Sequence, residues 1–106
     1  MIVRLLHYKI KPGMLDEYLG LFNDLKERVV DVKGLSFFNV FRDLEDPNTL
    51  FLASVFEDDA DMETYNEVGP NKEYSDAVGS LIESFGLAMA YEVSGARPIP
   101  SAAQTE

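Results

Sequence analysis

Hydrophobic and polar residues alternate along the chain with the period of a strand in some segments and of a helix in others. Residues 2–11 are rich in β-branched and aromatic residues and end at the turn sequence KPG, so we expect a strand there. From Leu15 onward, hydrophobic residues recur every three or four positions with charged residues between them, which predicts an amphipathic helix. Gly34 is expected to end this helix, because glycine readily adopts the left-handed conformation of a helix terminator.

The next segment, GLSFFNVFRD at residues 34–43, has the composition of a strand. Together with a second strand over residues 49–57 it predicts a hairpin around the turn LEDPN at residues 44–48. GLSFFNVFRD is hydrophobic at positions that alternate to both faces of a sheet, so we expect both of its faces to be covered.

Two further helices and a last strand are predicted in the remainder. Asp58 and the acidic residues after it suit the positive end of a helix dipole and offer an N-cap, which predicts a short helix that Gly69-Pro70 breaks. A second helical segment is predicted over residues 72–84, with Gly86 as its terminator, and a strand over residues 87–93.

The predicted order is β-α-β-β-α-β, which is a ferredoxin-like α+β fold with a four-stranded antiparallel sheet and the helices on one face. The other face of the sheet would be open, yet the strands place hydrophobic side chains on it. These are Val3, Leu5, Leu35, Phe37, Phe41, Phe51, Ala53 and Val55. Soluble monomers rarely expose such a patch, so we expect a homodimer that packs through the open sheet face.

His7 and Asn39 belong to this open face by alternation along their strands. His7 has an ordinary pKa near neutrality and is therefore a natural first choice for a catalytic base. Its place on the open face favours a hydrogen bond across the dimer interface, with catalysis as the alternative. Asn39 is expected to form cross-chain hydrogen bonds.

The 106-residue chain is long enough for one domain, which we predict over residues 1–93. Residues 94–106 contain small residues and prolines without hydrophobic periodicity, and a flexible C-terminal arm, or one that wraps around a partner, is expected there. The sequence contains no cysteine and one histidine, which excludes disulfides, thiolate nucleophiles and a multi-histidine metal site within one chain. No metal site is predicted.

The net charge is −10, and Lys72 is the only basic residue of the segment 43–92. Such a surface repels a phosphate backbone, so nucleic acid is not expected as a partner. No run approaches the length that a membrane helix needs, and the first residues lack the pattern of a secretion signal. We therefore expect no membrane association and a cytoplasmic location.

Several short motifs are similar to those of a known family. They are IKPG at residues 10–13, GLSFFNVFRD at residues 34–43 and DPNTLFLASVFEDDADMETY at residues 46–65. In this order they resemble the antibiotic biosynthesis monooxygenases, a family of dimeric α+β barrels, and the resemblance covers residues 1 to about 93. It implies a cofactor-independent monooxygenase that oxidises a small phenolic, quinol or polyketide-like aromatic with dioxygen, in an apolar pocket supplied with a base or hydrogen-bond donors.

Some positions depart from the family pattern. Phe56 stands where relatives often have tryptophan, and Tyr65 and residues 69–71 stand where many have histidine. Haem-degrading relatives use asparagine on the first strand, where this chain has Leu6, so haem is not expected. Because the histidine bases are missing, a non-catalytic small-molecule-binding or structural module on the same fold is the alternative function.

The resemblance places Phe56 against the helices, and alternation along the strands then assigns a pocket between sheet and helices. Its substrate-binding residues would be Leu6, Phe38, Val40, Ser54, Phe56 and Tyr74, with Tyr8 and Tyr65 as catalytic candidates. Packing in the core is the favoured explanation for the aliphatic and phenylalanine side chains. Each tyrosine phenol could donate to a substrate oxygen or to a backbone carbonyl.

Arg42 is the third catalytic candidate. It shares its side of the strand with Phe38 and Val40, and its guanidinium could hold an anionic oxygen in the pocket. At the end of a strand it could equally pair with Asp43 or Glu45, and exposed pairs contribute little to stability. The sequence leaves these two roles open.

Overall fold

The structure is a computed structural model that describes residues 1–92, without the side chains of Leu87 and Ala88. In chain order its elements are β1 (Ile2–Ile10), α1 (Leu15–Arg28), β2 (Leu35–Arg42), β3 (Thr49–Phe56), α2 (Asp59–Glu67), α3 (Gly69–Val78), a short 3₁₀ helix (Gly79–Leu81) and β4 (Ile82–Glu92). The predicted arm at residues 94–106 lies outside the described residues, as does residue 93, the last of the predicted domain.

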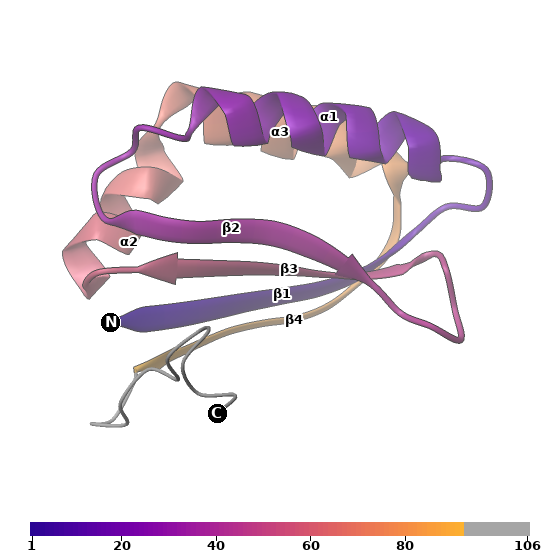
Figure 1. The fold of residues 1–106 in the computed structure, drawn as a ribbon. Helices are drawn as coiled ribbons and strands as arrows, with labels where there is room; N and C mark the ends of the chain where they lie inside the picture. Colours follow the sequence, from indigo (N-terminus) through magenta and orange to yellow (C-terminus); the bar gives the residue numbers. More distant parts are fainter. Residues whose placement is uncertain (93–106) are drawn as a thin grey trace, which may run out of the picture.

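The strands form one antiparallel sheet in the order β2-β3-β1-β4, and the helices pack on one of its faces. Figure 1 shows α1 and α3 side by side over the sheet, with α2 at the end where β2 begins and β3 ends. The predicted ferredoxin-like α+β fold is confirmed. No helix in the part of the chain that the structure describes has the length and hydropathy needed to cross a membrane.

The core lies between the helices and the face of the sheet that they cover. On β3, alternate residues Leu50, Leu52, Ser54 and Phe56 are buried, as strand periodicity requires. Buried α1 residues with helical spacing pack on them from above. These are Tyr18, Phe22 and Leu25. Burial of these apolar side chains is the main term that holds the helices to the sheet.

Leu35 of β2 lies on the helix-covered face of the sheet, and not on the open face as predicted. Leu35 pairs with Phe56 and packs against the core, whereas Phe37 pairs with Val55, so the register shifts between these two residues of β2. A β-bulge adds one residue to one strand and reverses the alternation beyond it. The prediction that Leu35 lies on the open face was therefore wrong.

The two glycines predicted as helix terminators have other roles. The helix α1 ends at Arg28, six residues before Gly34, which has a φ of 81° in the turn that enters β2. A Cβ on Gly34 would also overlap the carboxylate of Asp61. Gly86 lies within β4, where an added Cβ would stand 2.9 Å from the backbone oxygen of His7. Both positions need glycine because of close approach, and not to end a helix.

The ends of the last two helices also differ in part from the prediction. The predicted N-cap is confirmed, because the Asp58 carboxylate accepts a hydrogen bond from the backbone N–H of Asp61 at 2.9 Å. Gly69-Pro70 does separate two helices, but it begins α3, where proline fits the first turn. The helix predicted to reach residue 84 ends at Val78, and Ile82 already pairs with Ile10 of β1. Backbone pairing with β1 ends the helical pattern early.

Candidate active site

A two-lobed cavity lies between the covered face of the sheet and α3. Both lobes are lined by Leu6, Leu52, Tyr74, Ser75 and Phe85. The first lobe, of about 270 Å³, also has Tyr8, Val78 and Ile82 in its wall, and we call it the tyrosine lobe. The second, of about 250 Å³, also has Arg4, Phe38, Tyr65, Asn66 and Asn71, and we call it the arginine lobe. Together the lobes reach the size of a small-molecule pocket.

Three phenol groups from three elements meet beside the tyrosine lobe. Tyr8 comes from β1, Tyr18 from α1 and Tyr74 from α3. The hydroxyl oxygen of Tyr18 is 2.7 Å from that of Tyr74 and in hydrogen-bond contact with that of Tyr8. The Tyr8 and Tyr74 hydroxyl oxygens are 3.3 Å apart. Tyr18 is fully buried and does not line the cavity, so it stands behind the two tyrosines that do.

A count of protons shows what this cluster can offer to a ligand. Each phenol has one O–H to donate and two lone pairs that accept. Tyr18 contacts both partners but can donate to only one of them, so it accepts from the other. The tyrosine that accepts from Tyr18, either Tyr8 or Tyr74, keeps its own O–H. This O–H is free to donate into the tyrosine lobe or to make the longer contact of 3.3 Å between Tyr8 and Tyr74. A donor at the end of such a chain is strengthened by the bonds behind it.

The phenols of the cluster keep their protons at neutral pH. Burial is the main cause that raises the pKa of Tyr8, Tyr18 and Tyr74 above the ordinary value of 10.0. Burial likewise raises the pKa of Tyr65, against the opposing effect of the Arg4 charge. All four are therefore suited to donate hydrogen bonds to a developing oxyanion, and poorly suited to act as general bases.

Arg4 supplies the positive charge of the arginine lobe. Its Nη1 donates to Oδ1 of Asn66 at 2.6 Å, and its Cζ lies 5.4 Å from the ring centre of Phe56 and 5.6 Å from that of Tyr65. Its Nε is buried without a hydrogen-bond partner. Among the described residues, no carboxylate lies within ion-pair distance of the guanidinium.

The structure brings together five of the residues that the sequence assigns to the pocket. Leu6, Tyr8, Phe38, Tyr65 and Tyr74 all line the cavity. The other substrate-binding candidates belong to the core around it. Ser54 and Phe56 are fully buried, and Val40 packs against the core from β2.

The remaining candidates lie elsewhere. Arg42 is exposed at the end of β2 and is not among the residues that line either lobe. His7 stacks on Phe51 on the open face, with ring centres 4.4 Å apart and planes within 8°. Asn39 accepts a hydrogen bond at Oδ1 from the backbone N–H of Val40 at 2.9 Å.

Sequence reasoning missed Arg4 and Tyr18. Arg4 alternates with Val3 and Leu5 and so shares its side of β1 with Leu6 and Tyr8. A charged residue on the side of a strand that faces the core is unusual, and this could have marked Arg4 as a site residue. Tyr18 belongs to the hydrophobic stripe of α1, where its hydroxyl gives no separate signal. Asn66 and Phe85 were also missed, because the sequence does not show which residues of α2 and β4 reach the cavity.

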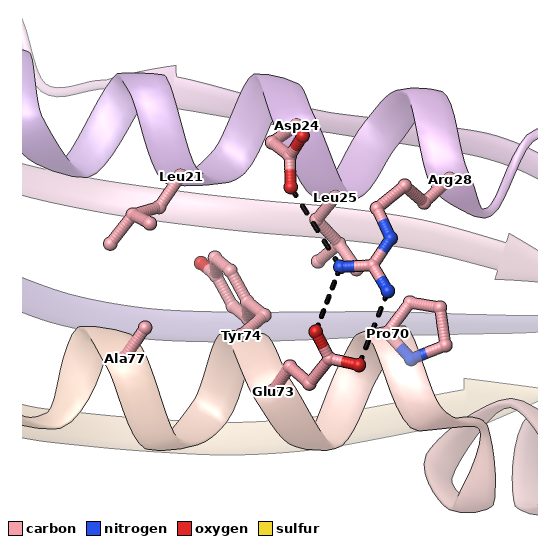
Figure 2. Close-up of a pocket in the computed structure, with 8 residues that line it drawn as sticks. All are labelled: Leu21, Asp24, Leu25, Arg28, Pro70, Glu73, Tyr74 and Ala77. Carbon is pink, nitrogen blue, oxygen red and sulfur yellow. Dashed lines mark hydrogen bonds and ion pairs between the residues drawn. The ribbon is translucent and has the colours of Figure 1, made fainter.

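A separate groove runs between α1 and α3 on the outer side of the helices (Figure 2). Arg28 of α1 reaches both carboxylate oxygens of Glu73 of α3, at 3.1 and 3.2 Å, and lies 3.8 Å from Asp24. The hydrogen bonds from Arg28 lower the pKa of Glu73. This groove holds about 150 Å³, and its charged groups already pair with one another, so we assign it a structural role between the helices.

Comparison with known proteins identifies the family. The model of the antibiotic biosynthesis monooxygenases matches residues 1–80. The chain belongs to this family. No curated protein matches the sequence.

Solved structures share the fold at low sequence identity. A conserved protein from Methanosarcina mazei has a TM-score of 0.83 and 18% identity, covering 88% of this chain and 92% of its own. A Deinococcus radiodurans protein, assigned provisionally to the antibiotic biosynthesis monooxygenases, has a TM-score of 0.83 and 17% identity over 94% and 99%. A further antibiotic biosynthesis monooxygenase has a TM-score of 0.81 and 17% identity over 89% and 99%. At these identities the likeness shows the shared fold.

Proposed function

We propose that the chain is a homodimeric, cofactor-independent monooxygenase that oxidises a small phenolic, quinol or polyketide-like aromatic with dioxygen. Membership of the antibiotic biosynthesis monooxygenases supports the reaction class. The observation that carries the proposal is the tyrosine lobe, whose apolar wall ends at the hydroxyls of Tyr8 and Tyr74, backed by Tyr18. An aromatic ring fits such a wall, and a phenolate or enolate oxygen fits the free O–H.

The oxidation balances without an external reductant. For an activated CH₂ group, loss of a proton gives a carbanion, which transfers its electrons to dioxygen. One oxygen atom then forms the new C=O bond, and the other leaves as water with the two hydrogens of the CH₂ group. A phenol balances in the same way, because its O–H hydrogen and one ring C–H hydrogen leave as water while the ring becomes a quinone. The protein's part is to hold the substrate and to stabilise the oxyanion of the enolate by donation from the tyrosine cluster.

The substrate must lose its proton without a histidine beside it. The only histidine of the sequence, His7, lies on the opposite face of the sheet, and burial raises the pKa of the tyrosines that line the cavity. We therefore propose that water or hydroxide takes the proton, and that hydrogen bonds from the phenols make the substrate easier to ionise. The rate should then rise with pH along the ionisation of the substrate itself.

The open face of the sheet supports the dimer. Phe37 and Phe41 of β2 are 43% and 49% exposed, with ring centres 6.3 Å apart. Leu5, Met89 and Tyr91 extend this exposed surface across β1 and β4. A second copy of the chain that packs on this face would cover it, with His7 and Asn39 inside the interface. The cytoplasmic location stays a prediction.

Oxygen consumption tests the activity. The purified protein is incubated with a panel of hydroquinones and anthrones in buffer made with ¹⁸O₂. We expect one O₂ consumed per product molecule, with one ¹⁸O atom in the product and the other in water. A folded dimer that consumes neither oxygen nor substrate across the panel would refute the proposal.

A binding module on the same fold is the second candidate. The absence of a histidine in the cavity favours it, since the family relatives that the sequence resembles place histidines on the helix. Calorimetry with the same aromatic panel separates the two. Binding at micromolar concentration without oxygen uptake supports the module, and binding with turnover supports the enzyme.

A further inference from the structure

The arginine lobe contains a positive charge in surroundings that would ordinarily disfavour it. Arg4 lies in the interior of β1 on the helix-covered face, with its guanidinium near the rings of Phe56 and Tyr65. Burial lowers the pKa of this guanidinium, although an arginine stays charged in proteins. A partly buried charge of this kind costs free energy unless a partner compensates it.

The protein compensates this charge only in part. Of the five N–H donors of Arg4, one has an acceptor among the described residues, Oδ1 of Asn66. The buried Nε has none. Tyr65 could neutralise the charge only as a phenolate, but burial raises its pKa and keeps it neutral. The interaction with two aromatic faces stabilises the cation without supplying the missing negative charge.

We propose that the arginine lobe binds the carboxylate of an aromatic acid, so that the substrate of the proposed monooxygenase is an acidic phenol. This inference rests on the proposed function for the reaction, but its binding step stands on Arg4 alone. A carboxylate in the arginine lobe would accept from the planar guanidinium and from Asn71, which lines that lobe and uses one of its two amide hydrogens on the backbone oxygen of Asn66. The aromatic ring would then extend past Tyr74, shared by both lobes, towards the tyrosine cluster.

The net charge of the chain does not favour the binding of an anion, so a preference for an acid depends on Arg4. At −10 the protein repels small anions at long range, so no general attraction explains why an anion would enter the cavity. Selection of an acid over a neutral analogue must come from a local cation. Arg4 is the one cationic residue among those that line the two lobes.

Two probes of nearly equal size test the inference. 4-Hydroxybenzoate and 4-hydroxybenzamide share the phenol ring and differ in the charge of the second group. Titration calorimetry at pH 7, where the carboxyl group is ionised, should give an affinity for the acid about tenfold or more above that for the amide. Equal affinities, or no heat with either probe at millimolar concentration, would overturn the inference.

Variants assign the preference to Arg4. Arg4→Gln should reduce the affinity for the acid about ten- to hundredfold and that for the amide less than about threefold. Lys11→Gln removes one positive charge from the exposed turn after β1 and is the matched control, expected to keep the preference. If Arg4→Gln weakens both probes equally, Arg4 serves packing alone and the proposal fails.

A second variant keeps the fold while it competes for the charge. Asn66→Asp places a carboxylate where the amide oxygen accepts from Arg4 at 2.6 Å, with almost no change in shape. This internal anion should abolish the preference for the acid and leave the affinity for the amide within about threefold. An unchanged preference would contradict the proposal even if Arg4→Gln does not fold.

Binding and turnover can fail separately. A protein that oxidises a neutral anthrone but shows no preference for the acid retains the proposed function and loses this inference. A protein that prefers the acid through Arg4 but oxidises nothing retains the binding site and loses the monooxygenase.

Discussion

The two faces of the sheet come from the same strands and are both rich in aromatic residues, yet they present those residues differently. On the covered face, Phe56 is fully buried and the phenols of Tyr8 and Tyr65 have their polar ends inside the protein. On the open face, Phe37 and Phe41 leave nearly half of their surface exposed. Apart from Phe85, which lines both lobes and is 57% exposed, the covered face packs its aromatic rings and holds polar groups that suit a small ligand. The open face offers apolar area that suits a protein surface.

The largest difference between the faces should appear in stability. Phe56→Ala should lower the free energy of unfolding by about 3–5 kcal/mol, because it leaves a cavity in the packed core. Phe37→Ala, the matched change on the open face, should cost less than about 1 kcal/mol in the monomer. Urea titration at a protein concentration where sedimentation shows monomers measures both. Equal losses would mean that the open face is packed within a single chain.

The arrangement of the two faces follows from the sequence because alternation along a strand assigns each side chain to a face. That rule placed Phe38 and Tyr8 with the helices and Phe41 and His7 opposite, as the structure shows. It failed at Leu35, because a bulge adds a residue without leaving a mark in the hydrophobic pattern.

The candidate site was less predictable because it depends on distances between elements. Tyr18 has the same helical spacing as a core residue, and only the fold shows that its hydroxyl meets those of Tyr8 and Tyr74. The arginine of the cavity also became visible only in the structure. Arg42 was a candidate anion site because it shares its side of the strand with Phe38 and Val40, but the structure places Arg4 in the cavity wall and leaves Arg42 outside it.

The open face gives the next largest expected effect. Phe41→Asp places a charge in the proposed interface and should weaken dimerisation at least about a hundredfold, since a desolvated carboxylate there would have no partner. Sedimentation over a range of concentrations measures the dissociation constant. Leu44→Asp, at a position that is 99% exposed in the turn between β2 and β3, is the control and should leave it unchanged. A wild-type chain that stays monomeric at high concentration would contradict the dimer itself.

The buried phenol of Tyr18, under the helices that cover the sheet, should make the free energy of unfolding sensitive to alkaline pH. Burial raises the pKa of Tyr18 above 10.0, so the folded protein keeps a proton that the unfolded chain loses as the pH rises past 10. The stabilisation is complete below pH 10 and is lost above it, at about 1.4 kcal/mol per pH unit for each such phenol. Tyr18→Phe should therefore make the decline of unfolding free energy above pH 10 shallower by about this amount. Parallel declines for both proteins above pH 10 would show that this phenol ionises without unfolding.

The smallest expected effect is on catalysis, and it compares a hydroxyl behind the cavity with a hydroxyl on the open face. Tyr18 does not line the cavity, so Tyr18→Phe should leave KM nearly unchanged, but it interrupts the chain of hydrogen bonds that strengthens the free phenol donor. Because that donor acts on charge that develops during the reaction, kcat should fall about three- to tenfold. Tyr91→Phe removes a hydroxyl from the open face, where its neighbour is the sulfur of Met89 at 3.1 Å, and should keep kcat within about twofold. A rise in KM with unchanged kcat for Tyr18→Phe would instead make the cluster a support for the shape of the pocket.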